Sequence, residues 1–340
     1  MTSARVSIAM AAYNGARFLP EQLASLAGQT LLPHELVVCD DGSDDETAEL
    51  VEAFGRESPF PVLLHVQERP RGLADNFLDA ASRCQGDLVA FCDQDDVWRE
   101  DKLHQCVAAL RDGIELVVHA CEVVDQGLNP TGAVFPRIKR PFVAEPPVAA
   151  TTLDVPGMAM VFSSELIRSV DWRARPRSHF LPGGMVYHDE WIHVLAGIRG
   201  RIGFLPGRLV RYRQHEVNVT GSPGGRVGSA AREALTIGRE YYLARAHQAR
   251  EWAELFERLA TREPHEALAG RYRSGASFFE QARRRLELRA APYEADGARA
   301  RLAAVARIFR AGAYRSRSAG GSGLRGLARD VAMIGLGRHG

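Results

Sequence analysis

The feature that most constrains the fold is a regular alternation of short apolar runs with helical segments in the first 124 residues. The runs are rich in Val, Leu, Ile and Phe and have the length of buried strands. The expected strands cover residues 5–12, 36–39, 62–66, 88–92 and 116–124. Helical periodicity over about 10 to 14 residues separates them. This alternation predicts βαβ units, and therefore an α/β fold with a mixed, mostly parallel sheet flanked by helices.

The pattern changes in the rest of the chain. It loosens after Pro130, through a Pro-rich loop at 136–147, before three further strand candidates and a helix. Those strands are expected at 155–162, 202–205 and 209–212, and the helix at 189–197. From about residue 226 the chain is rich in Ala, Arg, Glu and Leu with helical periodicity. We therefore expect an α/β domain over 1–222, a helical appendage over 223–312 and a flexible basic tail over 313–340.

The composition excludes several classes of protein. A hydrophobic content of 46%, a charged content of 25% and a formal net charge of +1 describe a globular chain without an overall nucleic-acid signature. No apolar run reaches the 18 residues of a membrane-spanning helix, and the start of the chain does not resemble a signal peptide. The five cysteines lack C-x-x-C spacing, which favours buried thiols over disulfides or zinc. We therefore expect a cytoplasmic protein.

Polar clusters follow three of the expected strands. They read AAYNG at 11–15, CDDGSDDET at 39–47 and CDQDD at 92–96. The carboxyl ends of parallel strands are where open α/β sheets bind ligands. Carboxylates crowded at such an edge repel one another, so a cation or a positively charged partner is expected among them. The alternative is a set of solvated turns whose Asp residues cap the following helices.

These clusters, in this order, closely resemble the inverting glycosyltransferases of family 2, which have the GT-A fold. The later segment HDEWIHVLAGIRGRIGFLPGRLVRYRQHEVNVTG resembles rhamnosyltransferase-like members of that family. The resemblance covers residues 5–221 and does not include the helical segment that follows. It implies a nucleotide-diphosphate sugar as donor, with dTDP-L-rhamnose as the specific candidate. It also implies a cell-surface polysaccharide or a lipid-linked glycan intermediate as acceptor.

The resemblance assigns a metal site to the third cluster. Asp95 is the expected metal contact, Asp93 binds the ribose or assists the metal, and Asp96 orients the pair. His215, in YRQH, lies where the family places a histidine that holds the metal or the diphosphate. Oxygen ligands suit Mg²⁺ or Mn²⁺, and an imidazole ligand favours Mn²⁺.

The resemblance also implies the residues that bind the donor. Asp40 and Asp41 would recognise the nucleobase, although turn chemistry also explains an acid in the D-D-G-S segment. Gly157 would leave room for the donor sugar or form a bulge. The full set of expected donor-binding residues is Ala12, Tyr13, Asp40, Asp41, Asn76, Asp93 and Gly157.

The expected catalytic residue is Asp189, in YHDEW. Its carboxylate would take the proton of the acceptor hydroxyl, with Glu190 as the second candidate. Its alternative role is to cap a helix. Arg211 and Arg213 lie near His215, and one of them is a candidate phosphate contact, although strand alternation would turn both outward.

Two other functions compete with this one. The segment DQDDV fits the motif of haloacid-dehalogenase-like phosphatases, in which Asp93 would be the nucleophile, but that motif normally follows the first strand. A catalytically inactive GT-A scaffold is disfavoured because Asp93, Asp95, Asp189 and His215 occur together.

The basic C-terminal segment suggests a partner. From Arg299 to the end there are nine Arg residues and one acid, Asp330. Basic helices with interleaved apolar residues bind anionic membrane surfaces, which would place the enzyme at the cytoplasmic face of the inner membrane. The alternative is a solvated bundle or an oligomer formed through the helical appendage. No nucleic-acid partner is expected.

Overall fold

The computed structural model describes residues 4–147, 155–181, 183–216, 238–312 and 314. This part of the chain forms two compact units. The first comprises residues 4–147, 155–174 and 187–216, and the second comprises 175–181, 183–186, 238–312 and 314. The expected α/β domain of 1–222 therefore differs from the first unit by the segment around 175–186. Its expected C-terminal boundary and almost all of the expected tail lie outside the described residues.

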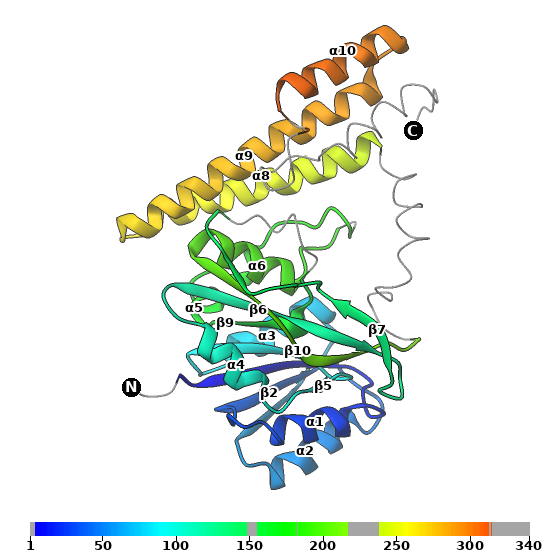
Figure 1. The fold of residues 1–340 in the computed structure, drawn as a ribbon, viewed down its shortest axis with the longest axis vertical. Helices are drawn as coiled ribbons and strands as arrows, with labels where there is room; N and C mark the ends of the chain where they lie inside the picture. The colour runs from blue at the N-terminus through cyan, green and yellow to red at the C-terminus, as the bar shows by residue number, and fades with distance from the viewer. Residues whose placement is uncertain (1–3, 148–154, 182, 217–237, 313, 315–340) are drawn as a thin grey trace. The chain divides into compact units, whose positions relative to one another are not determined.

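The first unit is built on a sheet that has ten strands in the described part of the chain. Along its main path the order is β3-β2-β1-β4-β9-β6-β10-β5, with β7 paired to β6 and β8 to β10. The strands are β1 (Val6–Ala12), β2 (Glu35–Asp40), β3 (Val62–Val66), β4 (Leu88–Asp93), β5 (Val97–Trp98), β6 (Ile114–Val124), β7 (Pro130–Phe135), β8 (Phe142–Ala144), β9 (Met160–Ser163) and β10 (Arg201–Arg213). The pairs among β3, β2, β1 and β4 are parallel, as is β6 with β10, whereas β9 is antiparallel to both neighbours. The expected α/β fold with a mixed, mostly parallel sheet is confirmed (Figure 1).

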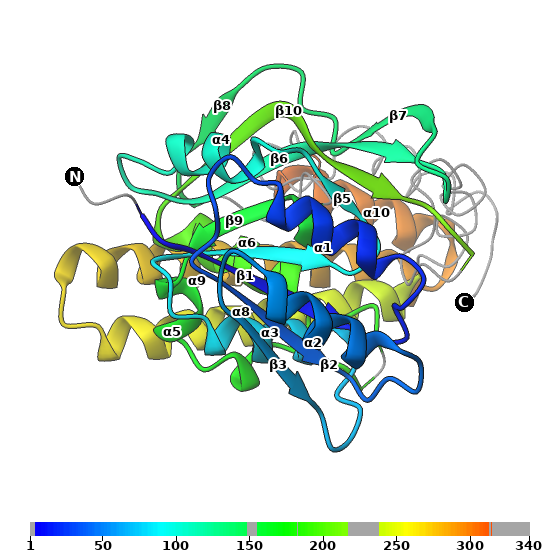
Figure 2. The ribbon, with the colours of Figure 1, turned by 90° about the horizontal axis from the view of Figure 1, so that it is seen from below.

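Helices cover both faces of this sheet. They are α1 (Leu19–Ala27), α2 (Thr47–Glu57), α3 (Leu73–Arg83), α4 (Lys102–Ala109), α5 (Glu165–Arg168) and α6 (His188–Arg199), with short 3-10 turns at Gly157–Ala159 and Trp172–Ala174. Helices α3, α5 and α6 pack against one another, while α1 and α2 form a separate pair. Figure 2 shows α1 and α2 in front of the strands, and in Figure 1 they lie on the side of the sheet away from α6.

The strand register brings the three polar clusters to one edge. Ala12 at the end of β1 is the register partner of Asp40 at the end of β2. Ala11 is likewise the partner of Asp93 at the end of β4. All three strands are buried over most of their length, because both faces of the sheet are covered. Their polar C-terminal residues are therefore carried to a shared edge by strands that cannot slip without exposing the core.

Several details differ from the sequence expectation. The strand expected at 155–162 begins only at Met160, after a 3-10 turn at Gly157–Ala159, and the short strand β5 was not expected. The strands expected at 202–205 and 209–212 are one strand, β10, whose register with β6 shifts between Leu205 and Val210, around Pro206 and Gly207. Proline has no amide donor for the ladder, so it interrupts pairing without ending the strand. Strands β7 and β8 were not expected, because they are largely exposed and lack an apolar run.

The second unit contains α8 (Arg239–Arg262), α9 (Glu266–Glu294) and α10 (Gly297–Arg310), which confirms the expected C-terminal helical region. Aromatic rings stack between α8 and α9, with Phe256 and Phe279 centroids 5.8 Å apart. The segment around 175–186 belongs here because it bonds to α8: Arg177 N donates to Glu251 Oε2 over 2.6 Å. None of the helices in the described residues combines the length and apolar character needed to cross a bilayer.

Candidate active site

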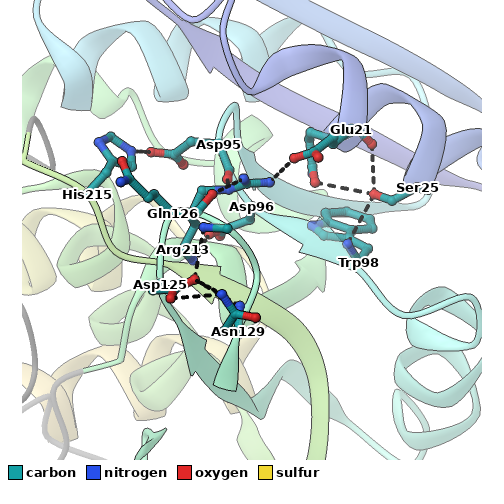
Figure 3. A network of polar contacts seen from close by, with 12 residues as sticks. Glu21, Ser25, Asp95, Asp96, Trp98, Asp125, Gln126, Asn129, Arg213 and His215 are labelled. Carbon is teal, nitrogen blue, oxygen red and sulfur yellow. Dashed lines mark hydrogen bonds and ion pairs between the residues drawn. The ribbon is translucent and has the colours of Figure 1, made fainter. Parts of the chain in front are cut away.

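The site is assembled around the turn that follows β4. Asp93 ends that strand, Asp95 and Asp96 lie in the turn, and β5 follows immediately. His215 follows the end of β10, and its Nε2 lies 2.7 Å from Asp95 Oδ2. Both side chains are largely buried, at 11% exposed for His215 and 18% for Asp95. The structure therefore brings together two residues that are 120 positions apart and that the sequence assigned to one metal site (Figure 3).

Arg213 holds this turn in place. Its backbone N donates to Asp96 Oδ1 over 2.9 Å, and its Nε donates to the carbonyl oxygen of Asp95 over 2.7 Å. Its Nη1 donates to the carbonyl oxygen of Gln126 over 2.8 Å, and its Nη2 pairs with Glu21. The expectation that strand alternation turns Arg213 outward is wrong, because its side chain is only 2% exposed. The turn is thus tied by one guanidinium to two other segments of the chain, helix α1 and the loop after β6 (Figure 3).

The acids of this turn are short of positive charge. Burial, and then the carboxylates of Asp95 and Asp189, raise the pKa of Asp93 to about 7. Burial, and then the carboxylates of Asp95 and Asp93, raise the pKa of Asp96 well above its usual range. The positive charge of Lys102 acts in the opposite direction on the pKa of both acids. Burial lowers the pKa of Lys102 itself to about 8, and its Nζ donates to Met158 O over 2.9 Å.

These residues fit a divalent cation that is completed by a ligand. Asp96 Oδ2 is buried and has no hydrogen-bond partner in the described part of the chain. The described part of the chain contains no group of three or more His, Cys, Asp or Glu side chains that could hold a metal ion by themselves. Mg²⁺ is usually held by one or two carboxylates together with substrate phosphates, and Mn²⁺ also accepts imidazole. Asp95 and His215 supply such a partial set of ligands.

A residue that sequence reasoning passed over joins the first and third clusters. Gln94 Oε1 accepts from Tyr13 N, and Gln94 Nε2 donates to Tyr13 O, both over 2.9 Å. A Cβ on Gly15 would collide with the Gln94 amide, which accounts for the glycine in AAYNG. The ring of Tyr13 is more than half exposed, so this candidate donor-binding residue is accessible. The signal in the sequence was the middle residue of the D-x-D motif, which was treated as a spacer.

The acids of the second cluster are engaged by the backbone. Both oxygens of Asp41 accept amide hydrogens, from Arg71 N over 2.7 Å and from Gly72 N over 2.9 Å. Asp40 is buried and accepts from both the backbone N and the hydroxyl of Ser43. These bonds are the turn chemistry that was the alternative explanation for D-D-G-S. Recognition of the nucleobase by either acid stays a prediction.

Asn76 is also buried, which does not favour the direct nucleotide contact that was expected. Its Nδ2 donates to Cys39 O over 2.7 Å and lies 3.5 Å from Ala12 O. Ala12 O in turn accepts from Asp41 N over 2.8 Å. Asn76 and Ala12 therefore hold the ends of β1 and β2 together at the edge where the clusters meet.

The candidate base lies in the first turn of α6. Tyr187 occupies the N-cap position, so Asp189 is not the cap that the alternative explanation required. Asp189 Oδ1 accepts from Glu190 N over 2.7 Å. The effect of Asp189 on the pKa of Asp93 places the two carboxylates in the same electrostatic environment. His188 packs against Gly157: a Cβ there would lie 2.5 Å from His188 Nε2. Room for the donor sugar at Gly157 stays a prediction.

Comparisons with known proteins bear on the fold and on the first half of the chain. The model of "Glycosyl transferase family 2" matches residues 7–167. The fold resembles the crystal structure of S. aureus TarS 1-349, with a TM-score of 0.54 and 16% identity over 98% of this chain and 92% of that one. The same protein in complex with UDP-GlcNAc gives a TM-score of 0.55 at 16% identity, with the same coverage.

Two curated relatives match shorter parts of the chain. An uncharacterized protein of Mycobacterium tuberculosis is 26% identical over 216 residues, which are 62% of this chain and 59% of that protein. An Escherichia coli protein is 31% identical over 121 residues, 35% of this chain and 47% of that protein. It is named UDP-Glc:alpha-D-GlcNAc-diphosphoundecaprenol beta-1,3-glucosyltransferase WfgD. The chain thus spans less than two thirds of the length of these relatives. Residues 7–167 therefore match the model of glycosyl transferase family 2, and the chain shares its fold with TarS.

Proposed function

We propose that the protein is an inverting glycosyltransferase that moves a sugar from a nucleotide-diphosphate donor to a hydroxyl of a cell-surface polysaccharide or a lipid-linked glycan. The observation that carries this proposal is the grouping of Asp93, the Asp95–His215 pair and Asp189 at the carboxyl edge of the sheet. The name of the E. coli relative, which describes a lipid diphosphate acceptor, supports the acceptor class.

The donor is proposed to carry a uracil or thymine base. UDP and dTDP share the same 2,4-dioxopyrimidine hydrogen-bonding edge. TarS in complex with UDP-GlcNAc and the UDP-Glc in the name of the E. coli relative support such a base. The rhamnosyltransferase-like segment in the sequence adds dTDP-L-rhamnose to the candidates.

Asp95 and His215, with Asp93, are proposed to hold Mn²⁺ or Mg²⁺ when the donor binds. The cation would neutralise the negative charge that develops on the departing diphosphate. Asp189 would accept the proton of the acceptor hydroxyl as that oxygen attacks the anomeric carbon, which inverts the configuration there. Such a base contributes ~10²–10⁴ in rate.

A binding panel tests the donor and the metal. UDP-glucose, UDP-GlcNAc and dTDP-L-rhamnose are titrated calorimetrically with Mn²⁺, with Mg²⁺ and with chelator. We expect one of them to bind with metal and to weaken at least tenfold in chelator. Asp95→Asn should remove that dependence, whereas Asp87→Asn, at the opposite end of the same strand, should keep it. Equal affinity with metal and chelator in the wild-type protein would refute the metal assignment.

The phosphatase alternative makes a different prediction. It requires a phosphorylated Asp93, which would be detected by mass spectrometry after incubation with a phosphate monoester. Asp93 ends β4 rather than the first strand, and the family match covers this motif. We expect no aspartyl-phosphate. The inactive-scaffold alternative is removed by any sugar transfer that depends on Asp189.

We also propose that α10 contacts an anionic membrane surface. Its sequence has four Arg residues and no acid. One face is buried, with Val305 and Ile308 packed in a cluster with Leu288 and Tyr314. Another face exposes Leu302 at 55% and Phe309 at 65%, seven positions apart and thus on one side of the helix. Exposed apolar side chains among arginines are typical of helices that lie in a lipid interface. Two copies of this basic face would repel each other, which disfavours a symmetric dimer through it.

Liposome co-sedimentation tests this contact. The protein should bind vesicles containing phosphatidylglycerol more strongly than vesicles of phosphatidylcholine, and added salt should weaken the binding. The double change Leu302→Gln and Phe309→Gln should reduce binding several-fold. The matched control is Leu32→Gln with Leu63→Gln, two exposed leucines of the first unit. Equal loss in both pairs, or no preference for the anionic vesicles, would refute the proposal.

A further inference from the structure

The imidazole of His188 is held in an aromatic slot. Its ring stacks on Phe77, with centroids 4.1 Å apart and an interplanar angle of 22°. The edge of Phe91 lies against it, at 5.0 Å and 86°. All three side chains are buried. The slot joins three elements, because Phe77 is on α3, Phe91 is on β4 and His188 is the first residue of α6.

Gly157 lies against one edge of the imidazole. A Cβ at this position would lie 2.5 Å from His188 Nε2 and 3.1 Å from Cδ2. The first distance is shorter than real side chains tolerate, so the imidazole would have to move. Phe77 and Phe91 already contact the ring, so it cannot turn towards either of them. Gly157 is not in the left-handed region, so the close approach of His188 is the reason for glycine here.

We propose that Gly157 and His188 form a lock that positions Asp189, an inference that rests on the proposed role of Asp189 as the base. His188 directly precedes Asp189 on α6, so the place of the imidazole sets the backbone of the first turn. Phe91 lies two residues before Asp93 on β4. The same slot therefore fixes the position of helix α6, which carries Asp189, relative to strand β4, which carries Asp93. His188 is thus a positioning residue, and Gly157 is the space that it requires.

A double-mutant cycle tests the lock. The four proteins are the wild type, Gly157→Ala, His188→Ala and the double variant. Gly157→Ala should leave the dissociation constant of the nucleotide sugar within threefold of wild type. It should lower kcat by ~10²-fold, since a misplacement of about 1 Å can have that effect. In the His188→Ala background the same change should alter kcat less than threefold, because the colliding ring is gone. This non-additivity is the signature of direct contact.

The competing explanation is that Gly157 makes room for the donor sugar. It predicts that Gly157→Ala weakens donor binding, and by the same factor whether or not His188 is present. That result would overturn the lock. So would a Gly157→Ala variant that unfolds at a lower temperature but keeps wild-type kcat, because the glycine would then serve stability alone.

A second variant covers the case in which Gly157→Ala does not fold. Phe77→Leu loosens the slot without a collision, and it should lower kcat at least tenfold with donor affinity unchanged. Its control is Phe60→Leu, a buried phenylalanine that precedes β3, which should lose stability without losing kcat. Equal kcat in the two variants would refute the lock.

Failure of the lock and failure of the proposed function are distinguishable. If Asp189→Asn transfers sugar at the wild-type rate, the assignment of the base fails. The thermal-unfolding values of the same four proteins still report on the contact of residues 157 and 188. If they are additive, the contact itself is refuted, whatever the reaction is.

Discussion

Replacement of Arg213 by Met tests whether the acidic turn depends on one buried guanidinium. Met keeps the apolar stem but removes the donors to Asp95 O and Gln126 O and the pair with Glu21. A buried acceptor that loses its partner costs about 1–3 kcal/mol. Both bonds are only partly buried, so we take the lower part of that range, or about 2–3 kcal/mol for the two carbonyls together. Glu21 is 54% exposed, and an exposed ion pair contributes only ~0–1 kcal/mol.

The assay is urea and thermal unfolding of Arg213→Met beside Arg211→Met, a matched control with an exposed side chain two residues earlier on β10. For a unit of this size 1 kcal/mol corresponds to about 2–4 °C, so the midpoint should fall by about 4–12 °C. The control should change it by less than 2 °C or so, as a surface substitution does. Metal-dependent donor affinity should also fall in Arg213→Met, because the backbone of the turn that carries Asp95 is released; Arg211→Met is the control for stability only. If the two variants have the same unfolding midpoint, the hydrogen bonds of Arg213 do not stabilise the turn and the reasoning is wrong.

Three further predictions concern single residues. Asp189→Asn should lower the initial rate of transfer by ~10²–10⁴ with donor affinity within a few-fold by calorimetry, and a near wild-type rate would make Glu190 the next candidate. Burial lowers the pKa of His119 to about 3, so His119 is neutral when folded and gains a proton on unfolding below about pH 6.5. The free energy of unfolding should therefore fall as the pH drops from 6.5 towards 3, by about 2 kcal/mol at pH 5. In urea unfolding, the His119→Gln variant should lose this pH dependence. The variant of the exposed His104, His104→Gln, should keep it. Gln94→Ala removes both bonds to Tyr13 and should weaken donor binding several-fold in the same calorimetric panel, whereas unchanged affinity would mean that the link is not needed at the site.

The sheet could be predicted from the sequence because its strands are buried on both faces. Burial requires continuous apolar runs, and such runs are visible in any single sequence. The meeting of the three clusters followed from the same fact, since parallel strands end at a common edge. Strands β7 and β8 were missed because exposed edge strands carry no such signal.

The burial of Arg213 could not be predicted in this way. Its partners Asp95 and Gln126 are 118 and 87 positions away, and they come from a turn and a loop without periodicity. Arg211, on the same strand, is exposed. Arg213 is the last residue of β10, and its side chain is directed to the turn after β4 instead of obeying the alternation of the strand. The three Asp residues of CDQDD indicate that a positive charge is needed nearby, but the sequence does not predict which of the chain's many Arg residues supplies it.

Gly157 shows the same limit and yields a last prediction. A glycine in a sequence is compatible with a bulge, a left-handed turn or a close approach, and nothing local decides among them. Here the deciding residue is His188, 31 positions later, whose Nε2 occupies the space of the missing Cβ. The two positions should therefore vary together. Relatives with Ala at the position of Gly157 should carry a side chain smaller than His at the position of His188, and relatives with His there should keep Gly. An alignment of family members that cover both positions checks this pairing. Frequent Ala at 157 beside His at 188 would show that the slot can widen, and the collision that underlies the lock would then lose its force.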